Sequence, residues 1–455
     1  MKHLANTLLV TTFVIGIGHV GNTLANGNKD QHWDDRKGHP GLRFMVEENQ
    51  AAIQTNSDNI ADNFALIQGN RDDIAANSAR IEVLESVSGG GGDPVPVDCD
   101  ADADAFRGIE IQSNTTYVIS GLCNGPIWIE NRQNVSLQGD GTGIKDDGVV
   151  LPAGLAEQPY GAIGVWQSRG ISLANLTVSA ANYVGQDYAF GSNVASLSAG
   201  NQSYVDVTEV DFVGGDYSVD VYNGTQVNLR GGVTVTGYNR AGLSAFNHGM
   251  IRTFGDISVS GLVGTSTETY PYAISAISNS VVEVRDGGSF SGASGQAVDE
   301  YPTAVWSGDN STVRFRNSTN PSTVNGSIES AYSSMVRISG NLVLNGALAA
   351  YHRGYIRATG LSQSDGPIYA GDASTIRLEQ GNVTTDTIDI YRQGNLRTNN
   401  TVINKGGADP IWVGGLSLIN LRGLTDLNGA EISCYGYGYI SIRSSVLNVG
   451  IVNYC

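Results

Sequence analysis

The chain has 455 residues, a formal net charge of −18 and only 15% charged residues. Its 59 glycines favour a turn-dense β protein and argue against an α/β enzyme built from long helices. The excess of acidic residues argues against nucleic acid as a partner and against binding to a membrane surface through basic residues.

The N-terminal residues 1–25 have the pattern of a secretory signal peptide, in which a basic start precedes the apolar run 4–18 and a small-residue cleavage site at Ala25. No apolar stretch of about 18 residues follows, so we expect no membrane-spanning segment after cleavage. We therefore expect an exported protein that is extracellular or at a cell surface, and a periplasmic location stays open. Residues 26–44 are polar, and we expect a loosely ordered arm without a metal site.

An apolar residue recurs every seven positions across residues 45–86, from Val46 to Ile81. This spacing predicts a left-handed coiled coil. Asparagine follows three positions later in five of the heptads, at Asn49, Asn56, Asn63, Asn70 and Asn77. These asparagines would lie in the seam, where three chains could point their amides at one central anion or water. The alternative is a monomeric helix that exposes its asparagines to solvent.

The heptads resemble the IxxN stalks of trimeric autotransporter adhesins, and the resemblance covers only residues 45–86. It implies a parallel homotrimer in which the asparagine layers hold anions. The residues from 419 onward continue a pattern of short strands and do not resemble the C-terminal membrane-barrel anchor of those adhesins. We therefore expect export through the signal peptide rather than self-translocation.

Residues 87–98 form a predicted linker with a flexible glycine part and a stiffer proline part. From residue 99 to residue 455, short alternating strands are separated by Gly, Asn, Asp and Ser. Downstream of residue 327 the pattern repeats every twenty residues. Two apolar columns follow this spacing: Ile328, Leu348, Ile368 and Ile388 in one, and Val336, Ile356, Ile376 and Leu396 in the other. The bends between them are predicted at Ser334, Gly354, Ser374 and Gly394.

A repeat this short cannot bury its apolar face alone, whereas stacked repeats form a continuous interior. We therefore predict an all-β domain over residues 99–455, a right-handed parallel β-helix of about fourteen coils. In pattern, this domain resembles the pectin-lyase-like superfamily. Insertions at 261–271 and 292–302 end alike, so we expect them to stack on one side as a wall or rim, to which the irregular stretch 144–215 adds.

The four cysteines predict two disulfide bonds in an exported protein. Proximity in the sequence favours Cys99–Cys123 and Cys434–Cys455, which would tie down both ends of the β-helix, although three connectivities are possible. A metal site is the weaker alternative, because neither a CxxC spacing nor a flanking histidine accompanies the cysteines.

A column of arginines follows the second apolar column. Each arginine comes directly after an inward residue, so strand alternation turns it outward. The members are Arg314, Arg337, Arg357, Arg377 and Arg397, with Arg252 earlier in the chain and Glu283 interrupting the column. Neighbouring guanidinium groups about 5 Å apart repel by roughly 1 kcal/mol even in water, unless carboxylates or a bound anion intervene. Such a row suits an acidic polysaccharide; the alternatives are a solvated row or one that meets acids of a neighbouring subunit.

Aromatic residues of the same repeats are the other candidates for contact with sugars. Strand alternation turns Trp128 and Trp412 outward, and Tyr355 lies two residues before Arg357. We include Tyr355 with the arginine column in the predicted ligand-binding site. Further aromatic residues on or near these strands are Tyr351, Tyr369, Tyr391 and Trp306. Exposed rings stack on sugars but also fill subunit interfaces, and both interpretations stay open.

Catalysis would need more than a basic column. In the pectin-lyase-like superfamily, lyases combine an acidic calcium cluster with a Lys or Arg base, and polygalacturonases combine NTD, DD, GH and RxK motifs. The pair Asp146 and Asp147 is the only DD pair of the predicted β-helix, and no NTD motif accompanies it. Carboxylates such as Asp286, Asp299 and Glu300 could still converge from separate coils. An enzyme therefore stays an alternative, with its catalytic residues unassigned.

Together these features predict a secreted or surface-associated homotrimer whose β-helix binds acidic polysaccharide, in adhesion or in a matrix. The predicted partners are further copies of the chain and a polysaccharide or cell-surface glycan. We expect no cofactor. Two alternative functions stay open: a polysaccharide lyase or glycoside hydrolase of the pectin-lyase-like fold, and a structural fibre or tailspike-like protein.

Overall fold

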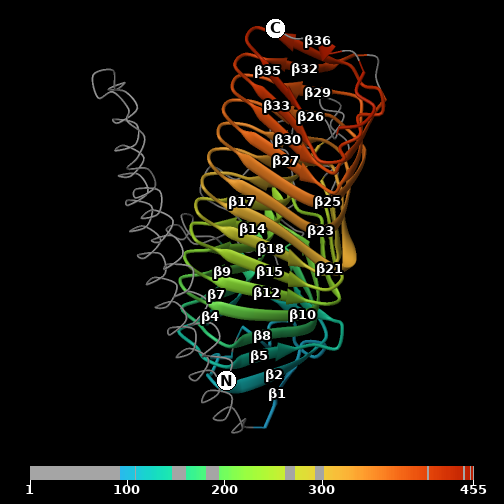
Figure 1. Cartoon of the computed structure of the whole chain (residues 1–455). Coiled ribbons are helices and arrows are strands. Elements are labelled where there is room, and N and C mark those ends of the chain that lie inside the picture. The colour runs from blue at the N-terminus through green and yellow to red at the C-terminus, as the bar shows by residue number, and fades with distance from the viewer. Residues whose placement is uncertain are drawn as a thin grey trace, which may run out of the picture. The chain divides into compact units, whose positions relative to one another are not determined.

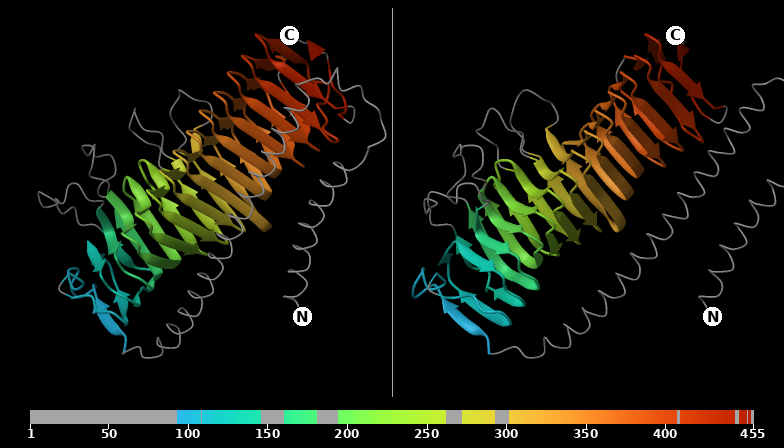
Figure 2. Two further views of the ribbon diagram at one scale, coloured as in Figure 1. Left: turned by 60° about the vertical axis from the view of Figure 1, so that its left-hand side comes forward. Right: turned by 90° about the vertical axis from the view of Figure 1, so that its left-hand side faces the viewer.

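The computed structural model describes residues 93–107, 109–145, 160–180, 194–261, 272–292, 302–406, 409–443, 446–450 and 452–453. Within these residues the chain is all-β, and parallel strands form two sheets of 14 and 22 strands. Parallel coils stacked along one axis (Figures 1 and 2) resemble the predicted β-helix. The predicted signal peptide, polar arm and coiled coil, with the asparagines of the heptads, lie outside the described residues.

The 14-stranded sheet contains one strand of each coil that follows β1, which agrees with the prediction of about fourteen coils. Its strands follow the chain order from β4 to β36, and each connection between neighbours crosses over through strands of the other sheet. They are β4 (Ile127–Glu130), β7 (Tyr160–Trp166), β9 (Val194–Gly200), β11 (Tyr217–Tyr222), β14 (Ala241–Phe246), β17 (Tyr272–Ile277), β20 (Thr303–Ser307), β22 (Ser327–Ser330), β24 (Leu348–Ala350), β26 (Ile368–Ala370), β29 (Ile388–Ile390), β32 (Ile411–Gly414), β34 (Ile432–Tyr435) and β36 (Val452–Asn453).

The 22-stranded sheet covers two further faces, because several long strands cross from one face to the other. For example, β10 pairs with β12 through its first half and with β13 through its second half. The first face contains β1 (Val95–Asp98), β2 (Thr115–Ser120), β5 (Val135–Gln138), β8 (Ile171–Ala180), β10 (Tyr204–Gly214), β12 (Gln226–Arg230), β15 (Met250–Phe254), β18 (Val281–Arg285), β21 (Thr312–Asn325), β23 (Met335–Asn345), β25 (Tyr355–Asp365), β27 (Thr375–Glu379), β30 (Asn395–Asn399), β33 (Leu418–Arg422) and β35 (Tyr439–Ile442). The second face adds β3 (Cys123–Asn124), β6 (Gly143–Lys145), β13 (Val233–Thr236), β16 (Ile257–Ser260), β19 (Gly288–Ser291), β28 (Asn382–Thr385) and β31 (Val402–Lys405).

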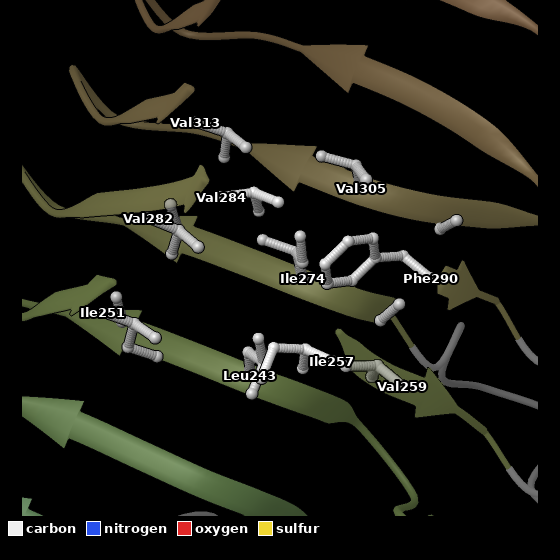
Figure 3. Close-up of a cluster of buried hydrophobic side chains, with 14 of the residues drawn as sticks. Leu243, Ile251, Ile257, Val259, Ile274, Val282, Val284, Phe290, Val305 and Val313 are labelled. Carbon is white, nitrogen blue, oxygen red and sulfur yellow. The ribbon is translucent and has the colours of Figure 1, made fainter. Parts of the chain in front are cut away.

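The interior of the coils is a continuous apolar core, because alternate residues of every strand point inward. Figure 3 shows one section of it. The labelled side chains are each at most 2% exposed and come from successive coils: Leu243, Ile251, Ile257, Val259, Ile274, Val282, Val284, Phe290, Val305 and Val313. Within this section Phe290 and Phe315 meet edge to face, with ring centroids 6.0 Å apart.

Both predicted apolar columns are confirmed by the strand register. Ile328, Leu348, Ile368 and Ile388 pair in that order in the 14-stranded sheet. Val336, Ile356, Ile376 and Leu396 pair in that order in the 22-stranded sheet. All eight side chains are fully buried, so the twenty-residue spacing is the length of one coil in this part of the chain.

The predicted bends are confirmed as well. The two residues before each of Ser334, Gly354, Ser374 and Gly394 have positive φ angles between 47° and 67°. At Gly354 a Cβ atom would lie 1.9 Å from the backbone oxygen of Ser330, so this bend requires glycine. Other bends use asparagine, which tolerates positive φ: Asn247 Nδ2 donates to Asn223 Oδ1 at 2.6 Å, and Asn223 Nδ2 donates to Asn201 Oδ1 at 3.0 Å. Each of these side-chain amides thus donates a hydrogen bond to the side-chain amide at the same position in the preceding coil.

The β structure begins four residues before the predicted domain boundary. β1 lies within the stretch predicted as a linker, and it pairs in parallel with β2. Pro96 fits there because, among the described strands, β1 pairs with β2 alone, so the missing N–H costs no ladder hydrogen bond with them. The predicted disulfide Cys99–Cys123 is confirmed and ties the end of β1 to β3. Cys455, the predicted partner of Cys434, lies outside the described residues.

The two predicted insertions leave their coils at the same corner. β16 pairs with β19 before the insertions, and β17 pairs with β20 after them. Most of both insertions lies outside the described residues, so the predicted wall or rim stays a prediction. The stretch 144–215 was predicted to be irregular, which is wrong for most of its length, because it contains β7 to β10 in regular parallel register.

Candidate functional site

The arginine column lies on the outer side of the first face of the 22-stranded sheet. Its five members pair in direct register from coil to coil: Arg314, Arg337, Arg357, Arg377 and Arg397. Neighbouring strands are about 4.8 Å apart, so the column is a straight row of positive charges about 20 Å long. Towards the N-terminus the register continues through Glu283 to Arg252.

Glu283 binds three arginines, one on its own strand β18 and one on each neighbouring strand. Its Oε1 lies 2.8 Å from Arg316 Nε, and its Oε2 lies 2.8 Å from Arg285 Nη2 and 3.5 Å from Arg252 Nε. The carboxylate side chain is only 5% exposed, whereas the three arginines keep between 34% and 52% of their surface. Glu283 therefore does not merely interrupt the column; it holds three guanidinium groups in place.

Glu379 has the same role further along the column. Its carboxylate forms ion pairs with Arg357, at 3.0 Å, and with Arg377, and it accepts a hydrogen bond from Thr359 Oγ1 at 3.2 Å. Burial raises the pKa of Glu379, but the hydrogen bond and charge of Arg357 and the charge of Arg377 outweigh it, so the pKa is lowered. The charge of these two arginines is thus partly neutralised.

The other three arginines of the column differ from these two. Arg314, Arg337 and Arg397 form no ion pair with any residue that the structure describes. Arg314 and Arg337 are neighbours in register, and together they line an open hollow of about 580 Å³. We call it the arginine hollow; Arg285, Arg316 and Asp286 also line it. Guanidinium groups outnumber carboxylates there, so the hollow can bind an anion through bidentate hydrogen bonds.

The repeat spacing alone did not identify Arg285 and Arg316 as part of this site. Both lie two residues after a member of the outward column, at Glu283 and Arg314, so strand alternation puts them on the same face. This two-residue spacing was the sequence signal that could have assigned Arg285 and Arg316 to the site. Arg285 also lies over the ring of Phe254, with 5.3 Å between Arg285 Cζ and the ring centroid. This cation–π contact helps to orient the Arg285 side chain.

Tyr355 lies on the same face but outside the hollow. It is half-buried and pairs in register with Met335 and Thr375, in the column next to the arginines. Trp128 and Trp412 lie on the 14-stranded sheet, so they do not share a face with the arginine column. The residues Asp146, Asp147, Asp299 and Glu300 lie outside the described part of the chain.

A buried carboxyl group lies on the 14-stranded sheet and was missed by the sequence patterns. Asp220 belongs to the outward column of β11, yet it is only 6% exposed. Its register neighbours are Ser198 and Ser244, and the latter hydrogen-bonds to it. Burial raises the pKa of Asp220 to about 6. A row of small side chains around a single acid was the signal that could have indicated this burial.

We expect Asp220→Asn to stabilise the protein at neutral pH. Between pH 4 and 6 the folded chain keeps a proton on Asp220 that the unfolded chain has lost, so the free energy of unfolding falls as the pH rises through this window. The variant avoids the buried charge and should gain about 3 kcal/mol at pH 7, and nothing at pH 3. Urea denaturation at both pH values measures this; a variant that is equally or less stable at pH 7 would contradict the assignment.

Within the described residues, no helix is long and apolar enough to cross a membrane. In the same part of the chain, no group of three His, Cys, Asp or Glu side chains is placed to hold a metal ion. No protein-family model matches the chain, and no curated protein matches it in sequence. The function is therefore proposed from the geometry of the arginine column and its hollow.

Proposed function

We propose that the protein binds an acidic polysaccharide along the arginine column. The observation that carries this proposal is the pair Arg314 and Arg337, two neighbouring guanidinium groups that form no ion pair with any described residue and that line one hollow. Like charges this close repel each other, and a bound carboxylate or sulfate would remove that repulsion. The pair therefore favours an anionic ligand over solvent.

The length of the column favours a polymer over a small anion. Five arginines in register repeat a positive group about every 4.8 Å. A single small anion could use two of them, whereas a chain of acidic sugars can follow the row. Arg397, the last arginine of the column, would extend the contacts with the polysaccharide beyond Glu379. The proposed ligand is thus an extended polysaccharide with one acid group on many of its sugars.

The rest of the chain fits a secreted or surface role. We propose that the parallel coils form a right-handed β-helix of the pectin-lyase-like type, since connections between parallel strands are almost always right-handed. We also propose that residues 45–86 form a homotrimeric coiled coil after export. Three linked β-helices would bind one polysaccharide more tightly than a single copy, because the second and third contacts are intramolecular.

A polysaccharide-cleaving enzyme is the second candidate, and Asp220 is the observation that favours it. A carboxyl group with a pKa of about 6 suits a general acid near neutral pH. Glycoside hydrolysis needs a second carboxylate within about 5 to 10 Å. The register neighbours of Asp220 are both serines. The binding function therefore has the stronger support.

Retention on an immobilised acidic polysaccharide tests the proposal. We expect the full-length chain to be retained on polygalacturonate at low salt and to elute as salt rises, because exposed charges are screened. Equal retention on uncharged dextran would contradict the proposal. The chain length of the polysaccharide, measured in the same samples, separates the two candidates: intact chains support binding, and shortened chains support the enzyme.

A further inference from the structure

Aromatic rings alternate with glycines on the outer side of the 14-stranded sheet, near its C-terminal end. Tyr351, Gly371, Tyr391, Gly414 and Tyr435 occupy one position in five successive coils, since each follows a residue paired in register. We call the three tyrosines the tyrosine row. Two coils separate each ring from the next, a distance of about 10 Å.

The glycines make room for the rings. A Cβ atom at Gly371 would lie 2.5 Å from Tyr391 Cζ, and one at Gly414 would lie 2.3 Å from Tyr435 Cε2. The rings of Tyr391 and Tyr435 therefore each occupy the space above a glycine of the preceding coil. The opposite side of the ring is turned away from the sheet, and Tyr435 is 43% exposed.

A second outward column runs beside the tyrosine row. It contains Tyr369, Asp389 and Trp412 in register. The ring of Trp412 lies 6.0 Å from that of Tyr435, and Tyr435 Oη donates a hydrogen bond to Asp389 Oδ1 at 3.4 Å. Burial among these rings raises the pKa of Asp389. Aromatic rings thus surround a carboxylate whose oxygens accept hydrogen bonds.

A hollow of about 370 Å³ adjoins the row at its N-terminal end. Tyr351 and Tyr369 line it together with two carboxylates, Glu329 and Asp386, and the described part of the chain contributes neither lysine nor arginine to its lining. Arg392 directly follows Tyr391; its Cζ lies 6.0 Å from the centroid of the Tyr391 ring, and its guanidinium forms an ion pair with Asp372 at 3.6 Å. The charge around the row is therefore negative, opposite to that of the arginine column.

We propose that the tyrosine row and its hollow form a second glycan-binding surface, which takes an uncharged polysaccharide chain. Aromatic rings stack on the C–H faces of sugar rings, and carboxylate oxygens accept hydrogen bonds from sugar hydroxyls. The carboxylates would repel an acidic sugar. The repeat of about 10 Å between rings is comparable with the length of a disaccharide, so one chain can stack on successive tyrosines. This surface acts independently of the arginine column.

Calorimetry of the full-length chain with three neutral probes tests this proposal: hexamers of β-1,4-glucose, of β-1,4-mannose and of N-acetylglucosamine. We expect at least one hexamer to bind, and Tyr391→Ala with Tyr435→Ala to weaken that binding roughly tenfold. Tyr437→Ala is the matched control, because Tyr437 is 83% exposed and lies outside the row. The affinity of this variant for the hexamer should equal that of the unchanged chain. Polygalacturonate should not compete with the bound hexamer.

Iodide quenching of tryptophan fluorescence adds a measurement that needs no variant. A bound hexamer is expected to shield Trp412, which is 37% exposed in the free chain. The proposal is overturned if none of the hexamers binds, or if Tyr437→Ala weakens binding as much as the double variant does. It is also overturned if sedimentation shows self-association that the double variant abolishes, since the row would then be covered by a second copy of the chain.

Discussion

Replacing Arg314 and Arg337 together by alanine is expected to weaken the affinity for polygalacturonate at least tenfold. These two arginines line the arginine hollow and form no ion pair with any described residue. Each hydrogen bond to a charged group contributes roughly 1.5 to 3 kcal/mol, and 1.4 kcal/mol corresponds to a tenfold change in affinity. Calorimetry at low salt measures the dissociation constants of the double variant and of the unchanged chain for polygalacturonate.

Two other variants separate this effect from a general loss of charge. Arg357→Ala with Arg377→Ala removes the same charge from the same column, but Glu379 already binds both guanidinium groups, so we expect only a roughly threefold loss. Arg169→Ala removes an exposed arginine remote from the column and should leave the affinity unchanged. Equal losses in the two double variants would show that the hollow has no special role.

Glu283→Gln is expected to lower the free energy of unfolding by about 3 kcal/mol, because removing one partner of a buried ion pair leaves the other charge without compensation. Here one carboxylate, 5% exposed, holds Arg252, Arg285 and Arg316. The effect lies at the lower end of the range for buried pairs, since the three arginines are partly exposed and water can solvate them. Urea denaturation measures it.

The same variant is expected to change binding in the opposite direction. Without the charge of Glu283, the potential around the arginine hollow becomes more positive, so the affinity for polygalacturonate should rise roughly threefold. Glu130→Gln is the matched control, because Glu130 is exposed on the 14-stranded sheet, and it should alter stability by less than about 0.5 kcal/mol. A loss of affinity in Glu283→Gln would mean that Glu283 contributes to binding by holding Arg285 and Arg316 in place, and that this outweighs the effect of its charge.

The coils could be predicted from the sequence because each one repeats the same apolar positions. The columns of Ile328 and Val336 needed only their spacing of twenty residues, and the register confirms both. Where the sequence pattern was less regular, the predicted local structure was wrong. Two prolines made residues 93–98 look like a linker, although β1 tolerates Pro96 as an edge strand. The coils of residues 144–215 have unequal lengths, which hid their regular strands.

The site was less predictable, because ion pairs depend on side-chain directions between coils. Spacing put Glu283 in the arginine column, where it looked like an interruption, yet its partners Arg285 and Arg316 come from a second column on the same face. Asp220 is a second residue whose surroundings could not be predicted from strand alternation. Strand alternation turns it outward, which predicts exposure, whereas the structure buries it between Ser198 and Ser244.

The comparison of polygalacturonate with its methyl ester tests the central claim most directly. Both polymers have the same sugar chain, and only the free acid carries negative charges for the arginine column. We expect the full-length chain to bind the free acid at least tenfold more tightly at low salt, with the difference shrinking as salt rises. Equal binding of the two polymers would contradict the account, because the arginines would then have no part in recognition.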